Sequence, residues 1–187
     1  MATLRHNLAN LISVPWAMFS LSVKKMLYAQ NLSFSGIQRF SPNVVVDVDK
    51  KSKLCFGKRV SAHSRCRLTA TNGGELLVGS GTSFNVGCIV TSRCRIVIGK
   101  NVSFGPNVMI YDHDHIMEAN KGAKEDGYRL GEIVIEDNCW IGAGAIILLG
   151  THVGRNSVIA AGSIVKGDVP ENTVLIQKRV NTYRGID

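Results

Sequence analysis

The sequence predicts a mainly β fold in which short parallel strands wind into a solenoid. The first observation is a six-residue repeat: from Ile135 the chain divides into IEDNCW, IGAGAI, ILLGTH, VGRNSV, IAAGSI and VKGDVP. Each unit begins with Ile or Val, and its fifth residue is almost always small. Glycine and asparagine at positions two to four suit tight turns with positive φ. The period also excludes a helix, because 3.6 residues per turn would rotate the aliphatic positions around its axis.

Less regular copies of the repeat occur earlier in the chain. They read VGSGTS, FNVGCI and VTSRCR from Val78, slip by two residues, and resume as IGKNVS, FGPNVM and IYDHDH from Ile98. A weaker copy, FGKRVS and AHSRCR, begins at Phe56. Three units close one coil, so we expect the first residue of each unit to point inward. It then stacks on its counterpart in the next coil, roughly 4.8 Å along the axis.

Length and charge set the broad class of the protein. The chain has 187 residues and a formal net charge of +8, which fits one domain with a sizeable core. The charge favours an anionic partner, such as a phosphorylated cofactor, an acidic polysaccharide or a membrane surface, although a solvated basic surface explains it as well. We expect no nucleic-acid partner, because the chain lacks an aromatic and basic platform, a helix-turn-helix pattern and a zinc finger.

The cysteines follow the repeat. Their odd number, five, matches neither a paired disulfide framework nor a CxxC metal pattern. Four of them take the small fifth position and are predicted to be buried fillers: Cys66, Cys88, Cys94 and Cys139. Cys55 lies outside the repeat and has no assigned role. Unpaired thiols favour a reducing compartment, so we expect a cytoplasmic protein.

The N-terminal segment, residues 1–35, precedes the repeat. Its apolar run from Leu8 to Val23 has no charged residue, but it is short for a membrane span and is interrupted by serines and Pro15. It also lacks a small-residue cleavage site. We expect one or two short helices that pack on the solenoid. The alternative is a weak contact of residues 8–25 with a membrane surface, which would place the protein at the inner face of the membrane.

One stretch interrupts the solenoid expected over residues 36–172. The repeat stops at His115 and resumes at Ile135, and the excursion between them, residues 116–134, has no six-residue period. Polar loops on rigid scaffolds often carry function, so this excursion is the first candidate for a site. A tail over residues 173–187 follows the solenoid.

Two histidines and two aspartates stand at the root of the excursion, in the sequence YDHDH from Tyr111 to His115. Histidines two apart on an extended strand point the same way and supply at most two ligands, so we expect no metal. Two other interpretations stay open. The polar side chains are hydrogen-bonded anchors of the loop, or one imidazole is a general base held by a neighbouring group.

The repeat, written [Ile/Val]-Gly-x-x-[small]-x, resembles the hexapeptide-repeat family. The resemblance implies a left-handed parallel β-helix, an exception to the right-handed default for parallel crossovers. The sequences FGPNVMIYDHDHI and IVIEDNCWIGAGAIILLGTHVGRNSVIAAGSIVKGDVPENT look like its sugar O-acetyltransferase branch, which includes galactoside, maltose and polysaccharide acetyltransferases. That branch implies transfer of an acetyl group from acetyl-CoA to a sugar hydroxyl, in capsule, exopolysaccharide or lipopolysaccharide synthesis.

The resemblance also implies site residues. His115 matches the general base of the family, and Asn85 matches an asparagine that holds the acceptor sugar. The implied reaction is direct transfer, with no acyl-enzyme and no metal. Four groups are candidates to orient the imidazole of His115: a backbone carbonyl, Asp112, Asp114 and Glu118. His113 is expected to support the loop, with contact to substrate as the alternative.

For the cosubstrate, the family implies a groove between subunits of a homotrimer. Six residues are the expected contacts of acetyl-CoA: Trp140, Gly142, Ala160, Lys166, Lys178 and Arg179. Glycine and alanine leave backbone amides approachable, and the cations suit phosphates. Trp140 is alternatively a packed cap on the coil. The sequence departs from the family in VKGDVP, where the lysine is shifted by one place, and in the tail, which lacks the usual glycine and proline. The contacts at the nucleotide end therefore stay open.

Two other functions stay open at this point. The same histidine base serves N-acetylation of an amino sugar or an antibiotic equally well. A non-catalytic β-helix that scaffolds a complex is the other alternative. Against the scaffold stands the occurrence of both His115 and Asn85 at the spacing of the family.

Overall fold

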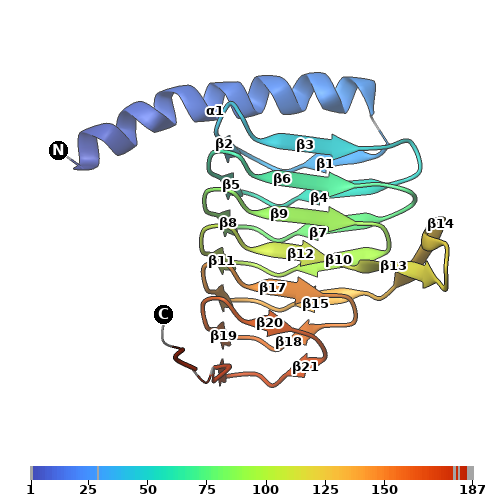
Figure 1. The fold of residues 1–187 in the computed structure, drawn as a ribbon. Coiled ribbons are helices and arrows are strands. Elements are labelled where there is room, and N and C mark those ends of the chain that lie inside the picture. The colour runs from blue at the N-terminus through green and yellow to red at the C-terminus, as the bar shows by residue number, and fades with distance from the viewer. Residues whose placement is uncertain (1, 29, 179, 181, 185–187) are drawn as a thin grey trace.

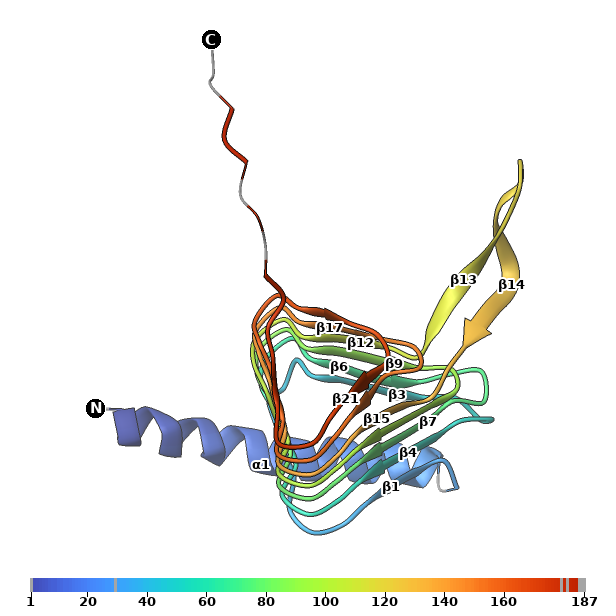
Figure 2. The same cartoon turned by 90° about the horizontal axis from the view of Figure 1, so that it is seen from below.

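The computed structural model describes residues 2–28, 30–178, 180 and 182–184. In the described chain a triangular solenoid of parallel strands has a long helix across one end and a hairpin projecting from one corner (Figures 1 and 2). The predicted mainly β solenoid is therefore confirmed. No helix in this part of the chain is long and apolar enough to cross a membrane.

Three parallel sheets, here called A, B and C, form the faces of the solenoid. Sheet A contains β1 (Leu32–Phe34), β4 (Lys53–Phe56), β7 (Glu75–Val78), β10 (Arg95–Ile98), β15 (Ile133–Ile135), β18 (His152–Val153) and β21 (Asp168–Val169). Sheet B contains β2 (Arg39–Phe40), β5 (Ser61–Ala62), β8 (Ser83–Phe84), β11 (Ser103–Phe104), β16 (Trp140–Ile141), β19 (Val158–Ile159) and β22 (Val174–Leu175). Sheet C contains β3 (Val45–Val48), β6 (Arg67–Ala70), β9 (Ile89–Ser92), β12 (Met109–Tyr111), β17 (Ile146–Leu148) and β20 (Ile164–Val165). The chain passes from A to B to C and then to sheet A of the next coil, so the solenoid has AB, BC and CA corners.

The first residue of each six-residue unit points into the core, as predicted. From β15 onward these residues are at most 3% exposed: Ile135, Ile141, Ile147, Val153, Ile159 and Val165. They stack in register between coils, so that Ile135 pairs with Val153 and Ile141 with Ile159. From Cys139 onward the small fifth residues are buried as well, because each lies where the coil turns a corner and a larger side chain would not fit.

Three of the four cysteines at the fifth position are buried, namely Cys66, Cys88 and Cys139. Burial raises the pKa of the Cys139 thiol, which donates to the carbonyl oxygen of Gly154 at 3.2 Å. The prediction is wrong for Cys94, which is only half-buried. Cys94 lies in the CA corner between β9 and β10, where the two-residue slip lengthens the coil and moves this residue out of the core.

Asparagines form the AB corners of the later coils. Asn101, Asn138, Asn156 and Asn172 all have positive φ, between 54° and 60°. Their side-chain amides are joined from coil to coil by hydrogen bonds of 3.0 to 3.3 Å. Asparagine tolerates the left-handed backbone that the turn requires, and the ladder satisfies its polar groups.

Both ends of the solenoid are capped. Helix α1 (Ala2–Leu27) is one continuous helix that runs through Pro15, which corrects the prediction of short helices. Residues on both sides of the proline, such as Ser13 and Ala17, are buried, and this packing outweighs the lost hydrogen bond. At the other end, the side-chain amide of Gln177 accepts from the N–H of Ile164 at 2.9 Å and donates to its carbonyl at 2.6 Å. It thereby takes the place of a further strand at the open edge of sheet C.

The solenoid extends beyond the boundaries expected from the repeat. Its first strand, β1, lies within the segment 1–35, and its last strand, β22, lies within the segment 173–187. These strands have three and two residues, too few to show a six-residue period. The excursion is a hairpin of β13 (His113–Glu118) and β14 (Gly122–Leu130) at the CA corner between β12 and β15, as Figure 2 shows. Cross-strand pairing begins at His113, three residues before the expected start.

Candidate active site

The hairpin places the two histidines of YDHDH side by side. His113 pairs across the hairpin with Leu130, and His115 pairs with Tyr128. Alternate residues of a strand share a face, so both imidazoles point the same way, as expected. Both also contact the ring of Tyr128, with centroid distances of 5.7 Å for His113 and 4.6 Å for His115. Tyr128 is therefore a platform for the imidazole pair.

Tyr128 also joins the hairpin to the solenoid. The guanidinium carbon of Arg93, at the CA corner of the preceding coil, lies 3.9 Å from the centroid of the tyrosine ring. Arg93 and Tyr128 line a pocket of about 300 Å³ together with Asn72 and Leu130. Sequence reasoning assigned no role to Arg93, Tyr128 or Asn72. The available signal was that Tyr128 is the only aromatic residue of the excursion.

Asp112 fastens the root of the hairpin. Its fully buried carboxylate accepts hydrogen bonds from the Ser92 hydroxyl at 2.6 Å and from the backbone N–H groups of Arg93 and Cys94 at 2.8 and 2.9 Å. Its own carbonyl accepts from the N–H of Gly131 at 2.9 Å. Asp112 therefore clips the start and the end of the hairpin to the corner of the preceding coil.

The same carboxylate holds His113. Nδ1 of His113 lies 3.1 Å from Oδ1 of Asp112, and the imidazole is mostly buried. When Nδ1 carries the proton and donates to Asp112, Nε2 is left as the acceptor. The expectation that His113 supports the loop fits this contact, and the dyad also orients its ring.

The groups expected to orient His115 lie elsewhere within one chain. Asp112 is bonded to His113 and to the corner. Asp114 alternates to the opposite face of β13, is exposed, and pairs in register with Arg129. The carboxylate of Glu118 lies 3.8 Å from Lys121 Nζ. Among the described residues, the contact that the ring of His115 makes is with Tyr128.

Asn85 lies at a different corner from the histidines. It occupies the BC corner before β9, where its exposed side chain accepts from the N–H of Val86 at 2.8 Å. The hairpin leaves from the CA corner at the other end of sheet C. A four-residue strand such as β9 spans roughly 13 Å, so a single chain does not bring Asn85 and His115 together.

Three of the expected acetyl-CoA residues lie at or next to the BC corners, as Asn85 does. Trp140 points outward from β16 in sheet B and is 56% exposed, so it is not a packed cap within one chain. Gly142 and Ala160 follow at the BC corners of successive coils. These residues and Asn85 therefore lie along one side of the solenoid.

The basic residues are divided. Lys166 lies at the CA corner after β20, on the other side of sheet C from Ala160. Lys178 is exposed beyond β22, and Arg179 lies outside the described residues. Lys178 thus follows the last strand of sheet B, whereas Lys166 lies at the CA corner.

Gly142 has a structural reason to be glycine. A Cβ on Gly142 would lie 2.5 Å from the Ala161 nitrogen and 2.7 Å from the Ile159 oxygen, both backbone atoms of the next coil. Gly144, two residues on, has φ +65° and nothing within 4 Å of a built Cβ. Gly142 is therefore required by the close approach of the next coil, and Gly144 by its positive φ.

Replacing Gly142 by alanine is expected to lower the free energy of unfolding by about 3 kcal/mol, because the coils must move apart. Gly144→Ala is the matched control and is expected to lower it by about 1 kcal/mol, from positive φ alone. Urea unfolding of both variants measures the difference. Equal losses would show that the close approach of the coils is not what requires glycine at position 142.

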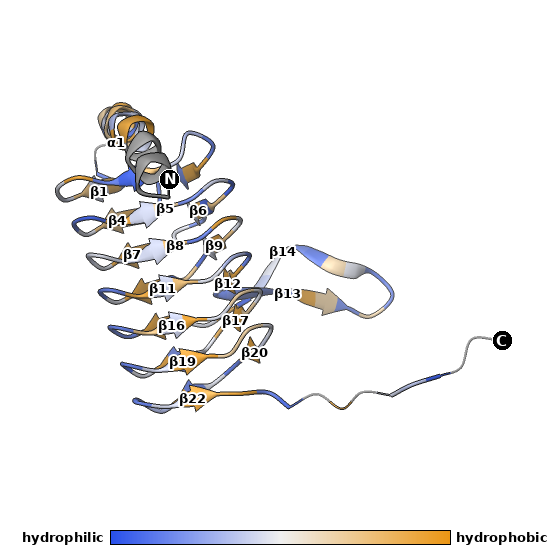
Figure 3. Ribbon diagram, turned by 90° about the vertical axis from the view of Figure 1, so that its left-hand side faces the viewer, coloured by the Kyte–Doolittle hydropathy of each residue, from blue (hydrophilic) through white to orange (hydrophobic). Residues whose placement is uncertain are grey.

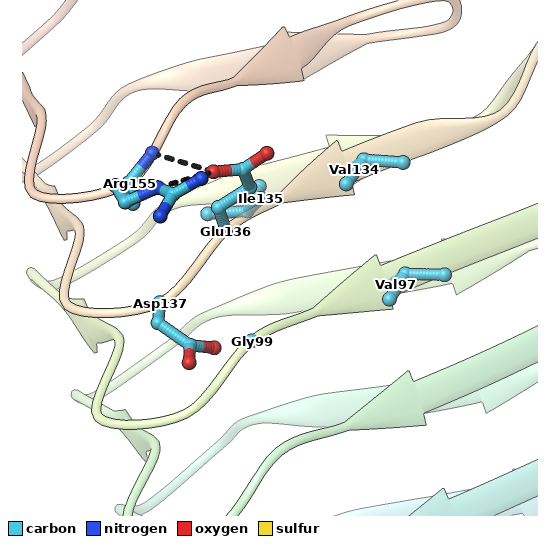
Figure 4. Close-up of a pocket in the computed structure, with 7 residues that line it drawn as sticks. All are labelled: Val97, Gly99, Val134, Ile135, Glu136, Asp137 and Arg155. Carbon is cyan, nitrogen blue, oxygen red and sulfur yellow. Dashed lines mark hydrogen bonds and ion pairs between the residues drawn. The ribbon is translucent and has the colours of Figure 1, made fainter. Parts of the chain in front are cut away.

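A second pocket lies on sheet A and its AB corner (Figure 4). It has a volume of about 360 Å³ and includes Glu136, Asp137 and Arg155 in its lining. The hydrogen bond from His152, 3.0 Å from Glu136, holds the pKa of that carboxyl below its usual range. The Arg155 guanidinium lies 3.5 Å from the same carboxylate. With two carboxylates and one partnered cation, this pocket does not suit the phosphates of acetyl-CoA.

The sequence was compared with family models and with curated proteins. Residues 132–166 match the family described as hexapeptide repeat of succinyl-transferase. Galactoside O-acetyltransferase of Lactococcus lactis is 34% identical over 115 residues, which cover 58% of this chain and 55% of that protein. The chain belongs to the hexapeptide-repeat acetyltransferase family. Galactoside O-acetyltransferase of Escherichia coli is 33% identical over 102 residues, 54% of this chain and 50% of that protein. This hexapeptide-repeat chain thus spans about half the length of these curated relatives.

Solved structures share the fold. A hexapeptide-repeat acetyltransferase of Vibrio cholerae, solved with acetyl coenzyme A, has a TM-score of 0.53 at 24% identity and covers 82% of this chain and 68% of its own. The N-acyltransferase AntD of Bacillus cereus, solved with dTDP-4-amino-4,6-dideoxyglucose and coenzyme A, has a TM-score of 0.63 at 15% identity and covers 88% of this chain and 89% of its own. At these identities the likeness shows the solenoid fold and no more.

Proposed function

We propose that this hexapeptide-repeat protein is an acetyl-CoA-dependent O-acetyltransferase that acts on a sugar hydroxyl. The observation that carries the proposal is the imidazole pair of His113 and His115, held on Tyr128 by a hairpin whose root is clipped to a rigid solenoid. The galactoside O-acetyltransferase relatives support the sugar as acceptor. We place the reaction in the cytoplasm, in capsule, exopolysaccharide or lipopolysaccharide synthesis.

His115 is the proposed general base. Its imidazole removes the proton of the sugar hydroxyl as that oxygen attacks the thioester carbonyl of acetyl-CoA. A new C–O ester bond forms, the C–S bond breaks, and the imidazolium returns its proton to the sulfur of CoA. Backbone N–H groups of a neighbouring turn stabilise the oxyanion. No acyl-enzyme and no metal take part in this scheme.

We propose that the site is completed by two copies of the chain in a homotrimer. Asn85 lies at the BC corner and His115 at the CA corner of one solenoid, so both reach one substrate only if each comes from a different copy. The outer face of sheet C between these corners supports the pairing of copies, because it carries a column of aliphatic residues in register: Ile89, Met109, Ile146 and Ile164. Aliphatic side chains on an outer face are typical of an interface.

Acetyl-CoA is placed along the edge that carries Asn85. Trp140, Gly142 and Ala160 are the proposed contacts of its pantetheine arm, and Lys178 extends toward the phosphates. Lys166 meets the cosubstrate only if it belongs to the neighbouring copy, since it lies at the CA corner.

Release of CoA tests the activity. The protein is incubated with acetyl-CoA, a thiol reagent and a panel of sugars and amino sugars. We expect release that depends on a sugar hydroxyl and a purified product that alkaline hydroxylamine cleaves, as it cleaves oxygen esters. A product that resists hydroxylamine would be an amide and would favour the N-acetyltransferase alternative. Absence of release with every acceptor would favour the scaffold.

Mixing two inactive variants tests the shared site. Asn85→Ala and His115→Ala are each expected to be weakly active alone. When the two are unfolded and refolded together in equal amounts, random trimers should recover roughly a quarter of wild-type activity, because one interface in four combines both intact residues. Separately refolded and then briefly mixed samples are the control. Lack of recovery, with mixed trimers demonstrated by differential tags, would place both residues in one chain's own site.

A further inference from the structure

Helix α1 has an exposed apolar stripe on the side away from the solenoid. Its residues are spaced by four, three, four and three, which places them along one line of a helix: Ile12, Trp16, Phe19, Val23 and Met26. Their exposed fractions run from 37% for Val23 to 78% for Met26. Figure 3 shows α1 at the end of the solenoid with hydrophobic residues along it. Large side chains in such a row are unusual for a surface in contact only with water.

The opposite side of α1 is already occupied. Ser13, Ala17 and Leu21 are buried, and the helix contacts the first coil through β1 and β2. On a helical projection this packed face lies nearly opposite the stripe. The stripe therefore cannot turn inward without loss of the contacts that cap the solenoid, and the described residues leave it exposed.

The charge of the chain is concentrated at the same end. The first 60 residues carry nine Lys and Arg against two Asp, a net charge of +7 out of +8. The other 127 residues carry 13 basic and 12 acidic side chains. The first acidic residue of the chain is Asp47. This asymmetry indicates an anionic partner for the helical end.

Several of these cations lie beside the end of the helix. Lys24 and Lys25 are in the last turn of α1. Lys50 and Lys51 are exposed at the first CA corner, which the side-chain amide of Asn31 ties to the segment after the helix by donating to the Lys50 carbonyl at 3.1 Å. Apolar and basic groups thus occur together, as in helices that bind anionic membrane surfaces.

A second copy of the chain fits this surface less well than a membrane. Pairing two helices by their stripes would bring together two segments that have no carboxylate in their first 46 residues and that repel each other. Trp16 and Phe19, in contrast, are the residue types that favour the boundary between lipid headgroups and acyl chains.

We propose that α1 and the adjacent lysines form a docking surface for an anionic phospholipid bilayer. The helix lies in the membrane surface with its stripe among the acyl chains, and the packed face keeps the solenoid outside. The hairpin leaves sheet C after β12, three strands from β3, so the imidazole pair is held roughly 14 Å beyond the first coil, in water. The proposal does not depend on the acetyltransferase activity.

Flotation of the full chain with vesicles tests the proposal. Vesicles of phosphatidylcholine alone are compared with vesicles that contain about 30% phosphatidylglycerol. We expect binding to the anionic vesicles and at least roughly tenfold weaker binding to the neutral ones. The double variant Trp16→Ser with Phe19→Ser is expected to bind the anionic vesicles at least roughly tenfold more weakly than wild type. Val174→Ser, which changes a 60% exposed valine in the last coil, is the matched control and should bind as wild type.

A second pair of variants tests the lysines. Lys50→Glu with Lys51→Glu is expected to weaken binding to anionic vesicles about tenfold or more, whereas Lys100→Glu with Lys121→Glu, equal in charge but distant from α1, should not. In the Trp140→Phe background Trp16 is the only tryptophan, so its emission should shift to the blue on anionic vesicles.

Four results would overturn the proposal. They are absence of wild-type binding, equal binding to both vesicle types, unchanged binding of the Trp16 and Phe19 variant, and an unshifted Trp16 emission. If that variant instead lowers the mass of the assembly in sedimentation and no vesicle is bound, the stripe is an interface between copies.

Transfer of acetyl groups to a soluble sugar should be the same in wild type and in the helix variants. Flotation measures binding and needs no enzymatic activity, so it can be interpreted even if the proposed acetyl transfer is not observed.

Discussion

Replacing His115 by alanine is expected to lower kcat for acetyl transfer by roughly 10²- to 10⁴-fold, the usual contribution of a general base. A sugar hydroxyl is a weak nucleophile until its proton is removed, and His115 is the exposed imidazole at the face of the hairpin. The measurement is the initial rate of CoA release at saturating acetyl-CoA and acceptor. KM for acetyl-CoA should change little, because the base acts on the acceptor.

His113 provides the internal control for this prediction. It contacts the same tyrosine ring, but its Nδ1 is bonded to Asp112 and its imidazole is mostly buried. His113→Ala is therefore expected to lower kcat by less than about tenfold, through looser positioning of the hairpin. A larger loss in His113→Ala than in His115→Ala would transfer the role of base to His113, whose ring is already oriented by a carboxylate.

Replacing Asp112 by alanine is expected to lower the free energy of unfolding by about 3–5 kcal/mol, because its hydrogen-bond donors lose a buried carboxylate and two of them, the N–H groups of Arg93 and Cys94, are left without an acceptor. The donors are the Ser92 hydroxyl and the N–H groups of Arg93 and Cys94, all within 2.9 Å. Urea unfolding measures the loss. In hydrogen exchange, the amide protons of Arg93 and Cys94 should exchange faster in the variant.

Asp114→Ala is the matched control for Asp112. It removes the neighbouring aspartate, which is exposed, and should change stability by no more than about 0.5 kcal/mol. Activity gives a second readout, since a loosened root should lower kcat in Asp112→Ala even under conditions where the variant is folded. Equal stability of the two variants would mean that the buried hydrogen bonds do not hold the corner.

The core of the fold could be predicted from the sequence because its signal is local and repeated. A residue such as Ile141 recurs every six positions in the last two coils, so its inward direction follows from the period alone. The N-terminal helix was less predictable. Pro15 suggests a break, but contacts of Ala17 and Leu21 with a coil formed later in the chain keep the helix continuous.

The candidate site could be found from the sequence, but its internal contacts could not. YDHDH was visible as the point where the repeat stops. The partners of Asp112, however, lie 18 to 20 residues earlier, and they meet it only because one coil stacks on the next. Tyr128 reaches His115 through the register of the hairpin, which no local pattern specifies.

The sequence by itself determined that this chain is a parallel solenoid of the hexapeptide-repeat family with one polar excursion, because a short period leaves one way to bury its aliphatic residues. Only the tertiary structure decided which corner each polar residue occupies. It placed Asn85 at the BC corner and the histidines at the CA corner. It paired Asp112 with His113 rather than with His115, and it left the stripe of α1 exposed. These outcomes depend on contacts between separate coils, and spacing along the chain does not encode them.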